Sequence, residues 1–124
     1  MSFWSRGRTP NILKDWQVLD KMEQLDTLAA ESQSQTVAIF KHSTTCGISH
    51  MVKDGLEQSW SLGPNDLKVY YLDLLAHRDI SNEVAKRFKV VHQSPQFIIL
   101  KNGKVSFQAS HHSISNGAIE RAIR

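Results

Sequence analysis

The 124-residue chain has one cysteine, Cys46, and only three prolines. A single thiol cannot close a disulfide within the chain, which excludes the disulfide-bonded scaffolds of small exported domains. Its apolar runs are far shorter than the roughly 18 residues of a membrane-spanning helix. The net charge of +3 comes from single basic residues scattered among acidic ones, without a basic stripe. We therefore expect a soluble protein that binds neither membranes nor nucleic acid.

The first residues lack the hydrophobic region and the small-residue cleavage site of a secretory signal. We expect a cytoplasmic location, where a free thiol stays reduced. Residues 1–10 are polar and predict a loose N-terminal arm. Residues 11–124 predict a single domain, long enough to bury a core without disulfides or metals.

Hydrophobic periodicity and turn residues define the expected elements. Strands are predicted over residues 16–19, 37–40, 67–74, 96–101 and 105–109, and helices over 20–29, 46–60, 79–88 and 113–123. Asp20 and Glu23 predict a capping box for the first helix, and Ser113 predicts the cap of the last. The Asn102-Gly103 pair is a hairpin signal. The alternating order predicts an α/β fold whose strands run parallel through the third helix, with an antiparallel edge strand added by the hairpin.

Cys46 lies where a buried strand ends and a helix begins. The free N–H groups and the positive dipole end of a helix stabilise an anion, so we predict a lowered pKa for this thiol and a nucleophilic role. The polar neighbours Thr44 and Thr45 argue against a buried, inert cysteine. Ser49 stands where a Cys-x-x-Cys protein has its resolving thiol, so a mixed disulfide on Cys46 needs an external thiol for release. The Ser49 hydroxyl either bonds the thiolate or is an ordinary first-turn serine.

Other polar residues near Cys46 leave alternatives open. Lys41 assists the thiolate, or holds an anionic group of a bound thiol, or is simply solvated. Cys46 and His50 are one helical turn apart, but two ligands do not make a zinc site, so we expect no metal. His50 could instead stabilise the Cys46 anion.

Two segments carry a family resemblance. Residues 41–49, KHSTTCGIS, and residues 94–99, SPQFII, resemble the monothiol bacilliredoxins, the YtxJ type of bacillithiol-linked thioredoxin-like proteins. The resemblance implies that residues 11–124 form a thioredoxin-like α/β domain with a central mixed sheet of about four to five strands flanked by helices. Gly47 departs from the family pattern, which has proline at this position; glycine leaves one more N–H near the sulfur.

The resemblance also implies a function. We expect a monothiol thiol-disulfide oxidoreductase that removes a low-molecular-weight thiol, bacillithiol, from S-thiolated client proteins through a mixed disulfide on catalytic Cys46. The small thiol is a co-substrate, no cofactor is bound, and the protein is a monomer or weak dimer. Pro95 is implied to be a cis-proline beside Cys46, with the backbone of Ser94 facing the substrate. The expected substrate-binding residues are Thr45, Gly47, Ile48, Ser49, Ser94, Pro95 and Lys41.

A rival interpretation starts from the same motif. Cys-Gly-Ile-Ser also resembles the Cys-Gly-Phe-Ser signature of monothiol glutaredoxins, which use glutathione and carry iron–sulfur clusters. Their Gly-Gly-x-Asp stretch before the last helix is replaced here by Ala-Ser-His-His-Ser over residues 109–113. A cluster carrier, or a redox-inactive binding module, therefore ranks second.

Overall fold

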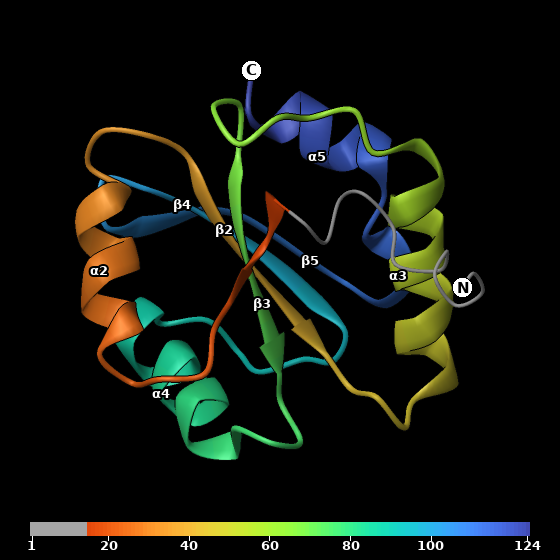
Figure 1. Ribbon diagram of the computed structural model, residues 1–124, viewed down its shortest axis with the longest axis horizontal. Coiled ribbons are helices and arrows are strands. Elements are labelled where there is room, and N and C mark those ends of the chain that lie inside the picture. Colours follow the sequence, from red (N-terminus) through yellow and green to blue (C-terminus); the bar gives the residue numbers. More distant parts are fainter. Residues whose placement is uncertain (1–14) are drawn as a thin grey trace, which may run out of the picture.

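The computed structural model describes residues 15–124, so the arm expected over residues 1–10 lies outside the described residues. Five strands form one mixed sheet in the order β1-β3-β2-β4-β5. Figure 1 shows α2 and α4 together on one side of this sheet and α3 and α5 on the other. The elements are β1 (Gln17–Val18), α2 (Gln24–Glu31), β2 (Val37–His42), α3 (Gly47–Ser59), β3 (Lys68–Asp73), α4 (Arg78–Phe88), β4 (Gln96–Lys101), β5 (Lys104–Ser110), the 3₁₀ helix η2 (His111–Ser113) and α5 (Asn116–Ala122). The predicted α/β class and the central mixed sheet are confirmed.

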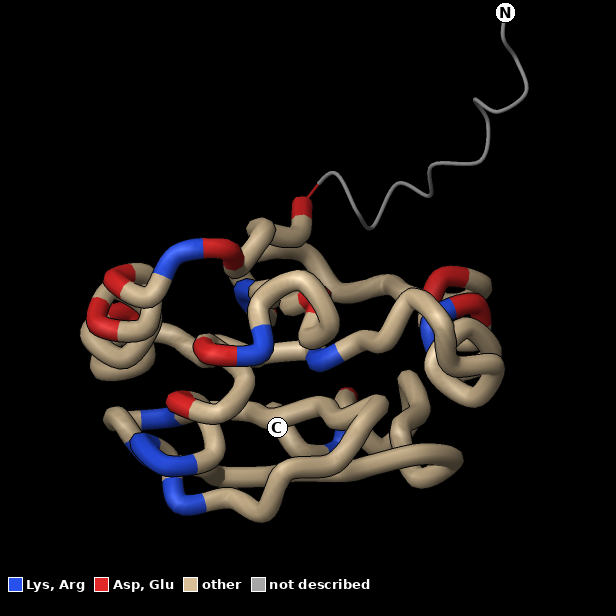
Figure 2. The backbone as a smooth tube through the Cα atoms, turned by 90° about the horizontal axis from the view of Figure 1, so that it is seen from below, with Lys and Arg blue, Asp and Glu red and all other residues tan. Residues whose placement is uncertain are grey.

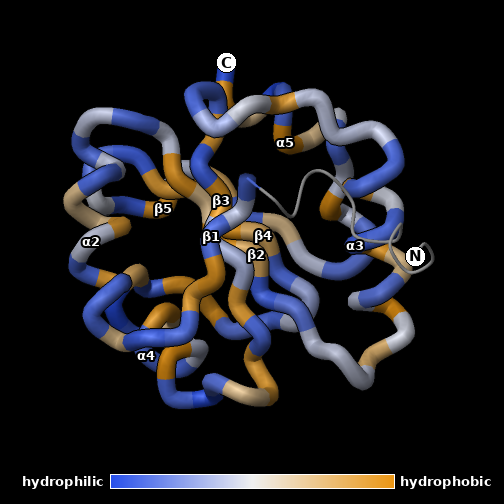
Figure 3. The backbone as a smooth tube through the Cα atoms, in the orientation of Figure 1, coloured by the Kyte–Doolittle hydropathy of each residue, from blue (hydrophilic) through white to orange (hydrophobic). Residues whose placement is uncertain are grey.

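The central strand β2 is buried along its whole length because both of its faces are covered by helices. Its side chains alternate between two cores. Phe40 packs in one cluster with Val52 and Leu56 of α3, and Ile39 packs in the other with Val84 of α4. Figure 3 shows the hydrophobic segments concentrated in these inner strands. The end of β2 is thereby fixed from both sides, and the loop to Cys46 starts from this rigid point.

The direction of β4 differs from the sequence prediction. β2 pairs parallel with β3 but antiparallel with β4, in a register that sets Lys41 opposite Gln96. The sequence prediction made β4 parallel, so that α4 would return the chain to the end of the sheet where β2 and β3 begin. An 11-residue helix spans about 16 Å, and the seven residues 89–95 can extend over about 23 Å. This segment is long enough to bring the chain back to the edge from which α4 started, so β4 enters the sheet reversed.

The Asn102-Gly103 hairpin is confirmed. Both residues have positive φ, 54° and 77°, as a type I′ turn requires. The returning strand β5 pairs antiparallel with β4 at the edge of the sheet.

The start of the first long helix was predicted too early. The expected capping box of Asp20 and Glu23 is not formed, and α2 begins at Gln24. The Gln24 side chain takes the capping role instead. Its Oε1 accepts hydrogen bonds from the backbone N–H groups of Asp20 and Lys21, both at 2.8 Å, and its Nε2 donates to the carbonyl of Val18 at 2.9 Å. A side chain inside the helix thus accepts hydrogen bonds from two backbone N–H groups that precede the helix.

The cap of the last helix also lies two residues later than predicted. Ser113 ends η2, whereas Ser115 caps α5 by accepting a hydrogen bond from the N–H of Ala118 at 3.1 Å. Ile114, which the periodicity placed in the helix, is extended and inserts into the core between the two segments.

Charged residues that are scattered in the sequence meet at one corner of the fold. Figure 2 shows several Lys and Arg together there. Arg87, Lys89 and Lys104 line a hollow between the end of α4 and the turn after β4. Because β4 starts near the loop of Cys46 and ends at this corner, the basic corner and the thiol lie at opposite edges of the sheet. No helix within residues 15–124 is long and apolar enough to cross a membrane.

Candidate active site

Three segments far apart in the sequence meet where β2 ends and β4 begins, at the side of the sheet that we call the thiol edge. β2 ends there and leads to Cys46, and β4 starts there after Ser94 and Pro95. The N–H of His111, just after β5, donates to the carbonyl of Pro95 at 3.1 Å. The Ser94–Pro95 peptide bond is cis, as expected. The antiparallel β4 is what brings the proline segment to the thiol edge.

Cys46 is the N-cap residue of α3, in an extended conformation and half-buried. Its pKa lies below the ordinary value. The backbone N–H of Ser49 is the main cause; desolvation opposes it, and the N–H of Ile48 and the hydroxyl of Ser49 add to the lowering. The predicted stabilisation of the thiolate by the helix start is therefore present in the geometry.

Ser49 is fully buried directly behind Cys46. Besides its contact with the sulfur, its hydroxyl accepts a hydrogen bond from the N–H of Ser43 at 3.3 Å. This hydroxyl thus links the start of α3 to the loop before Cys46. The residue in the resolving position is thus fixed in place and carries oxygen instead of sulfur.

Thr45, Gly47 and Ile48 surround the thiol and are exposed to solvent. The Thr45 hydroxyl lies 3.4 Å from the hydroxyl of Ser43. A Cβ on Gly47 would meet no heavy atom within 4 Å. The donors that lower the pKa of Cys46 are those of residues 48 and 49, so the extra N–H that glycine provides is not one of them.

His50 contacts the loop before Cys46. Its Nε2 lies 2.8 Å from the carbonyl oxygen of Thr44, and since a carbonyl only accepts, Nε2 carries the hydrogen. The ring of His42 meets the ring of His50 edge-on at 5.0 Å. His42 is buried, and burial, followed by the nearby charges of His50 and Lys53, lowers its pKa to about 4. This contact of His50 therefore helps to hold the loop before Cys46.

Lys41 is not solvated. It is fully buried, and its Nζ lies 3.2 Å from the carbonyl oxygen of Ser81 and 3.1 Å from Nδ1 of His92. These partners lie on the α4 face of the sheet, whereas α3 and Cys46 lie on the other face. Sequence reasoning missed both partners, because nothing local marks a histidine 51 residues away as a neighbour.

All the histidines of the chain lie at the thiol edge, a clustering that the sequence does not reveal. They are His42, His50, His77, His92, His111 and His112. Within residues 15–124, however, no three His, Cys, Asp or Glu side chains come together as metal ligands would.

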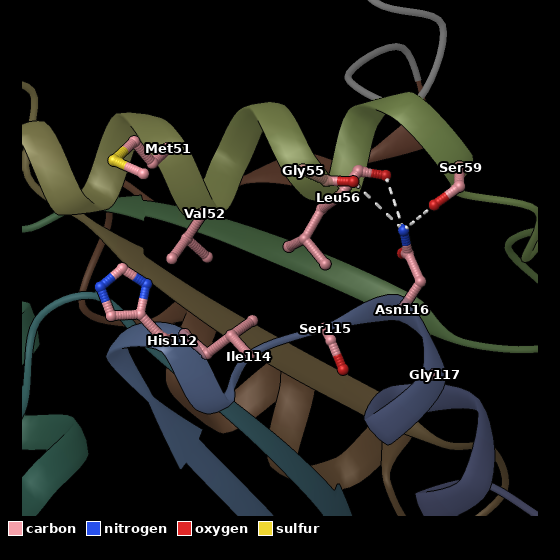
Figure 4. Close-up of a pocket in the computed structure, with 10 residues that line it drawn as sticks. All are labelled: Met51, Val52, Gly55, Leu56, Ser59, His112, Ile114, Ser115, Asn116 and Gly117. Carbon is pink, nitrogen blue, oxygen red and sulfur yellow. Dashed lines mark hydrogen bonds between the residues drawn. The ribbon is translucent and has the colours of Figure 1, made fainter.

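A groove of about 400 Å³ runs between α3 and the segment that leads into α5 (Figure 4). Met51 and His112 flank it at one end. At the other end, Nδ2 of Asn116 donates to the carbonyls of Gly55 and Leu56, both at 3.3 Å, and to the hydroxyl of Ser59. Cys46 does not line this groove, so the groove is separate from the thiol.

Comparisons with known proteins agree with this geometry. A family model described as Monothiol bacilliredoxin BrxC matches residues 17–119. A solved structure of a protein with a thioredoxin fold and a proposed oxidoreductase activity is 28% identical, covers 90% of this chain and 96% of its own, and superposes with a TM-score of 0.77. Mitochondrial thioredoxin 3 from Saccharomyces cerevisiae, in its oxidised form, is 20% identical over 89% of this chain and 94% of its own, with a TM-score of 0.66. The thioredoxin of Malassezia sympodialis is 21% identical over 87% of both chains, with a TM-score of 0.67.

Proposed function

The chain belongs to the monothiol bacilliredoxin family of thioredoxin-like thiol oxidoreductases, and from this premise we propose that it removes bacillithiol from S-thiolated client proteins. The observation that carries the proposal is the pairing of a thiol of lowered pKa at the start of α3 with a buried serine in the resolving position. Such a site can accept a thiol group but cannot release it unaided.

The reaction has two exchange steps. The Cys46 thiolate attacks the small-thiol sulfur of the client's mixed disulfide; a new S–S bond forms on Cys46 and the client sulfur leaves as a thiolate, which takes a proton from water. A second small-thiol molecule, as its thiolate, then attacks the adduct. It releases the Cys46 thiolate and leaves as the oxidised small-thiol disulfide, so the client is reduced and the small thiol is oxidised.

Exposed apolar side chains beside the thiol support a protein as the client. Ile48 and Leu75 are each 38% exposed and Val91 is 78% exposed. They belong to α3, to the loop after β3 and to the loop before β4, which all lie at the thiol edge. These exposed side chains are available for contact with a client protein.

We assign Ser94 and Pro95 to contact with the transferred thiol. The start of β4 adjoins the end of β2, so the backbone of Ser94 faces the region of Cys46. The Ser94 hydroxyl is buried and has no hydrogen-bond partner within residues 15–124, so the contact that we assign to this residue is made by its backbone. Gly47 and Ile48 of α3, and Thr45 of the loop before it, line the same region.

The test is the fate of the adduct. After exposure to oxidised bacillithiol, intact mass is expected to show one adduct on the wild type and none on Cys46→Ser. The adduct should persist until external thiol is added. In Ser49→Cys the new thiol, one helical turn from Cys46, should displace the adduct and leave an internal disulfide.

Ser61→Cys is the matched control. It adds a thiol beyond the far end of α3, about 20 Å away for a 13-residue helix, and should retain the adduct as the wild type does. If the wild type forms no adduct, or sheds it without external thiol, the proposal is wrong. Protein purified without air should also be colourless, since a brown preparation would indicate an iron–sulfur cluster.

A further inference from the structure

Lys41 is a charged residue buried in the central strand without an opposite charge. Its side chain is fully buried, and no ion pair within residues 15–124 includes it. Burying an ammonium group is unfavourable unless its hydrogen bonds are satisfied. An apolar residue would fill the same space at lower energy. The presence of a lysine here therefore points to a function for its contacts.

While Lys41 is charged, its contact with His92 exists in only one protonation state of the histidine. The ammonium group can only donate, so the carbonyl of Ser81 and Nδ1 of His92 are the acceptors, at 3.2 and 3.1 Å. His92 is then neutral and carries its hydrogen on Nε2. Protonation of Nδ1 would remove the acceptor and place two cations against each other.

A second buried polar side chain holds the same loop. Gln96 lies opposite Lys41 across β2 and β4 and is also fully buried. Its Nε2 donates to the carbonyl of Val91 at 2.9 Å, and its Oε1 accepts from the N–H of Gln93 at 3.3 Å. Three consecutive loop residues are thus tied to the sheet through polar contacts.

Apolar packing does little for residues 91–93, because the Val91 side chain is 78% exposed. The anchored residues come immediately before Ser94 and Pro95, which the proposed function assigns to contact with the transferred thiol. The polar contacts of Lys41 and Gln96 therefore set the position of this substrate-facing segment.

We propose that Lys41 and His92 are positioning residues that hold the segment before Ser94 and Pro95 in the conformation that receives the thiolated client. The proposal rests on the proposed function. It does not involve contact with the Cys46 sulfur, which lies on the other face of the sheet.

The charged groups that face His92 make this contact sensitive to acid. They are Lys41 from β2 and Arg78 from α4. Burial, then the Lys41 charge and then the Arg78 charge lower the pKa of His92, so the neutral ring persists below the ordinary range for histidine. Once the pH falls through that lowered pKa, the contact is lost.

Two substitutions at His92 separate the contact from its titration. His92→Leu removes the acceptor, whereas His92→Gln keeps an acceptor oxygen that does not titrate. The probe is a short peptide whose cysteine carries a bacillithiol disulfide. His92→Leu is expected to lower kcat/KM for this peptide about tenfold, the effect of one lost hydrogen bond. His92→Gln should keep the neutral-pH rate and lose the part of the acid decline that His92 causes.

Alkylation of Cys46 by iodoacetamide is the internal reference, because this small reagent does not need the Ser94–Pro95 segment. Its rate and pH midpoint should stay unchanged in both variants. His77→Gln is the matched control, since His77 lies at the same edge and its side chain makes no capping bond. Wild-type kcat/KM in His92→Leu, or a parallel fall in alkylation, would overturn the proposal.

Hydrogen exchange provides a measurement that does not depend on catalysis. The backbone amides of residues 91–94 should exchange about tenfold faster in His92→Leu than in the wild type, with those of α3 unchanged. If the wild type fails to react with the peptide, the proposed function fails, and the hydrogen exchange still decides the positioning role. Unchanged exchange in residues 91–94 would refute it.

Discussion

Replacing Lys41 by methionine is expected to make the protein more stable at neutral pH and less active in thiol exchange. Burial lowers the pKa of Lys41 from 10.5 to about 8, because the fully buried ammonium has only neutral partners. Between these two values the unfolded chain binds a proton that the folded chain has lost, so the free energy of unfolding rises with pH.

The size of the effect follows from the same two values. The fall from 10.5 to about 8, at about 1.36 kcal/mol for each pH unit, means that the buried ammonium lowers the free energy of unfolding by about 3 kcal/mol at pH 7. Of this, about 2 kcal/mol disappears between pH 7 and pH 9.5. Methionine fills a similar volume without a charge, so Lys41→Met should gain about 1–3 kcal/mol at pH 7.

The assay is urea unfolding of both proteins at pH 7.0 and pH 9.5, followed by tryptophan fluorescence. Cys46 also titrates in this range, but both proteins contain it, so their difference isolates the lysine. Burial raises the pKa of Tyr71 to about 12; its folded form keeps the proton longer than the unfolded chain, and its destabilising effect begins only above about pH 10.

Lys86→Met, which removes an exposed lysine of α4, should respond to pH as the wild type does. The variant's advantage should shrink by about 2 kcal/mol between the two pH values, while its kcat/KM for the thiolated peptide falls about tenfold. The prediction is wrong if Lys41→Met is no more stable than the wild type at pH 7, or if the difference in their free energies of unfolding is the same at both pH values.

Three further predictions concern the thiol itself. Ser49→Ala should raise the pKa of Cys46, measured as the iodoacetamide rate against pH. It should also lose about 1–3 kcal/mol of stability, because the buried N–H of Ser43 loses its acceptor. An unchanged pH midpoint of alkylation would show that the hydroxyl does not act on the sulfur. Cys46→Ser should abolish exchange with the thiolated peptide and change the free energy of unfolding by less than about 1 kcal/mol, since serine suits an N-cap position, whereas a larger loss would indicate a structural cysteine. Gly47→Pro should stabilise the fold by about 0.4–1 kcal/mol, measured by urea unfolding. Proline suits the first position of a helix, and Cys46 before it is already extended. Slower alkylation of Cys46 in this variant would mean that the Gly47 N–H does reach the sulfur.

The parts of the structure that depend on neighbouring residues could be predicted from the sequence. The placement of Cys46 at the start of α3 follows from an apolar strand that leads into a helical pattern, and the Asn102-Gly103 turn follows from the backbone freedom of these two residues. Both features are settled within about ten residues of chain, where spacing and residue type carry the information.

The missed features depend on residues that are distant in the sequence. The direction of β4 is decided by residues 89–95, whose length allows either direction. Lys41 stands at the end of an apolar run, a position typical of a solvated strand end. However, β2 continues to His42, and the Lys41 side chain contacts Ser81 of α4. Its partner His92 becomes a neighbour only because β4 is reversed. One topological choice therefore controls both the proline segment and the lysine contact.

The buried hydroxyl of Ser49 also has an evolutionary meaning. Serine and cysteine differ by one atom, and their codons can differ by one nucleotide. Ser49 is fully buried and already contacts the Cys46 sulfur, so a single point mutation would place a second thiol against the first without any change in the backbone. A lineage with this fold can pass between one-thiol and two-thiol chemistry in one step. The dependence on an outside thiol therefore rests on the identity of one side chain, and not on the architecture of the domain.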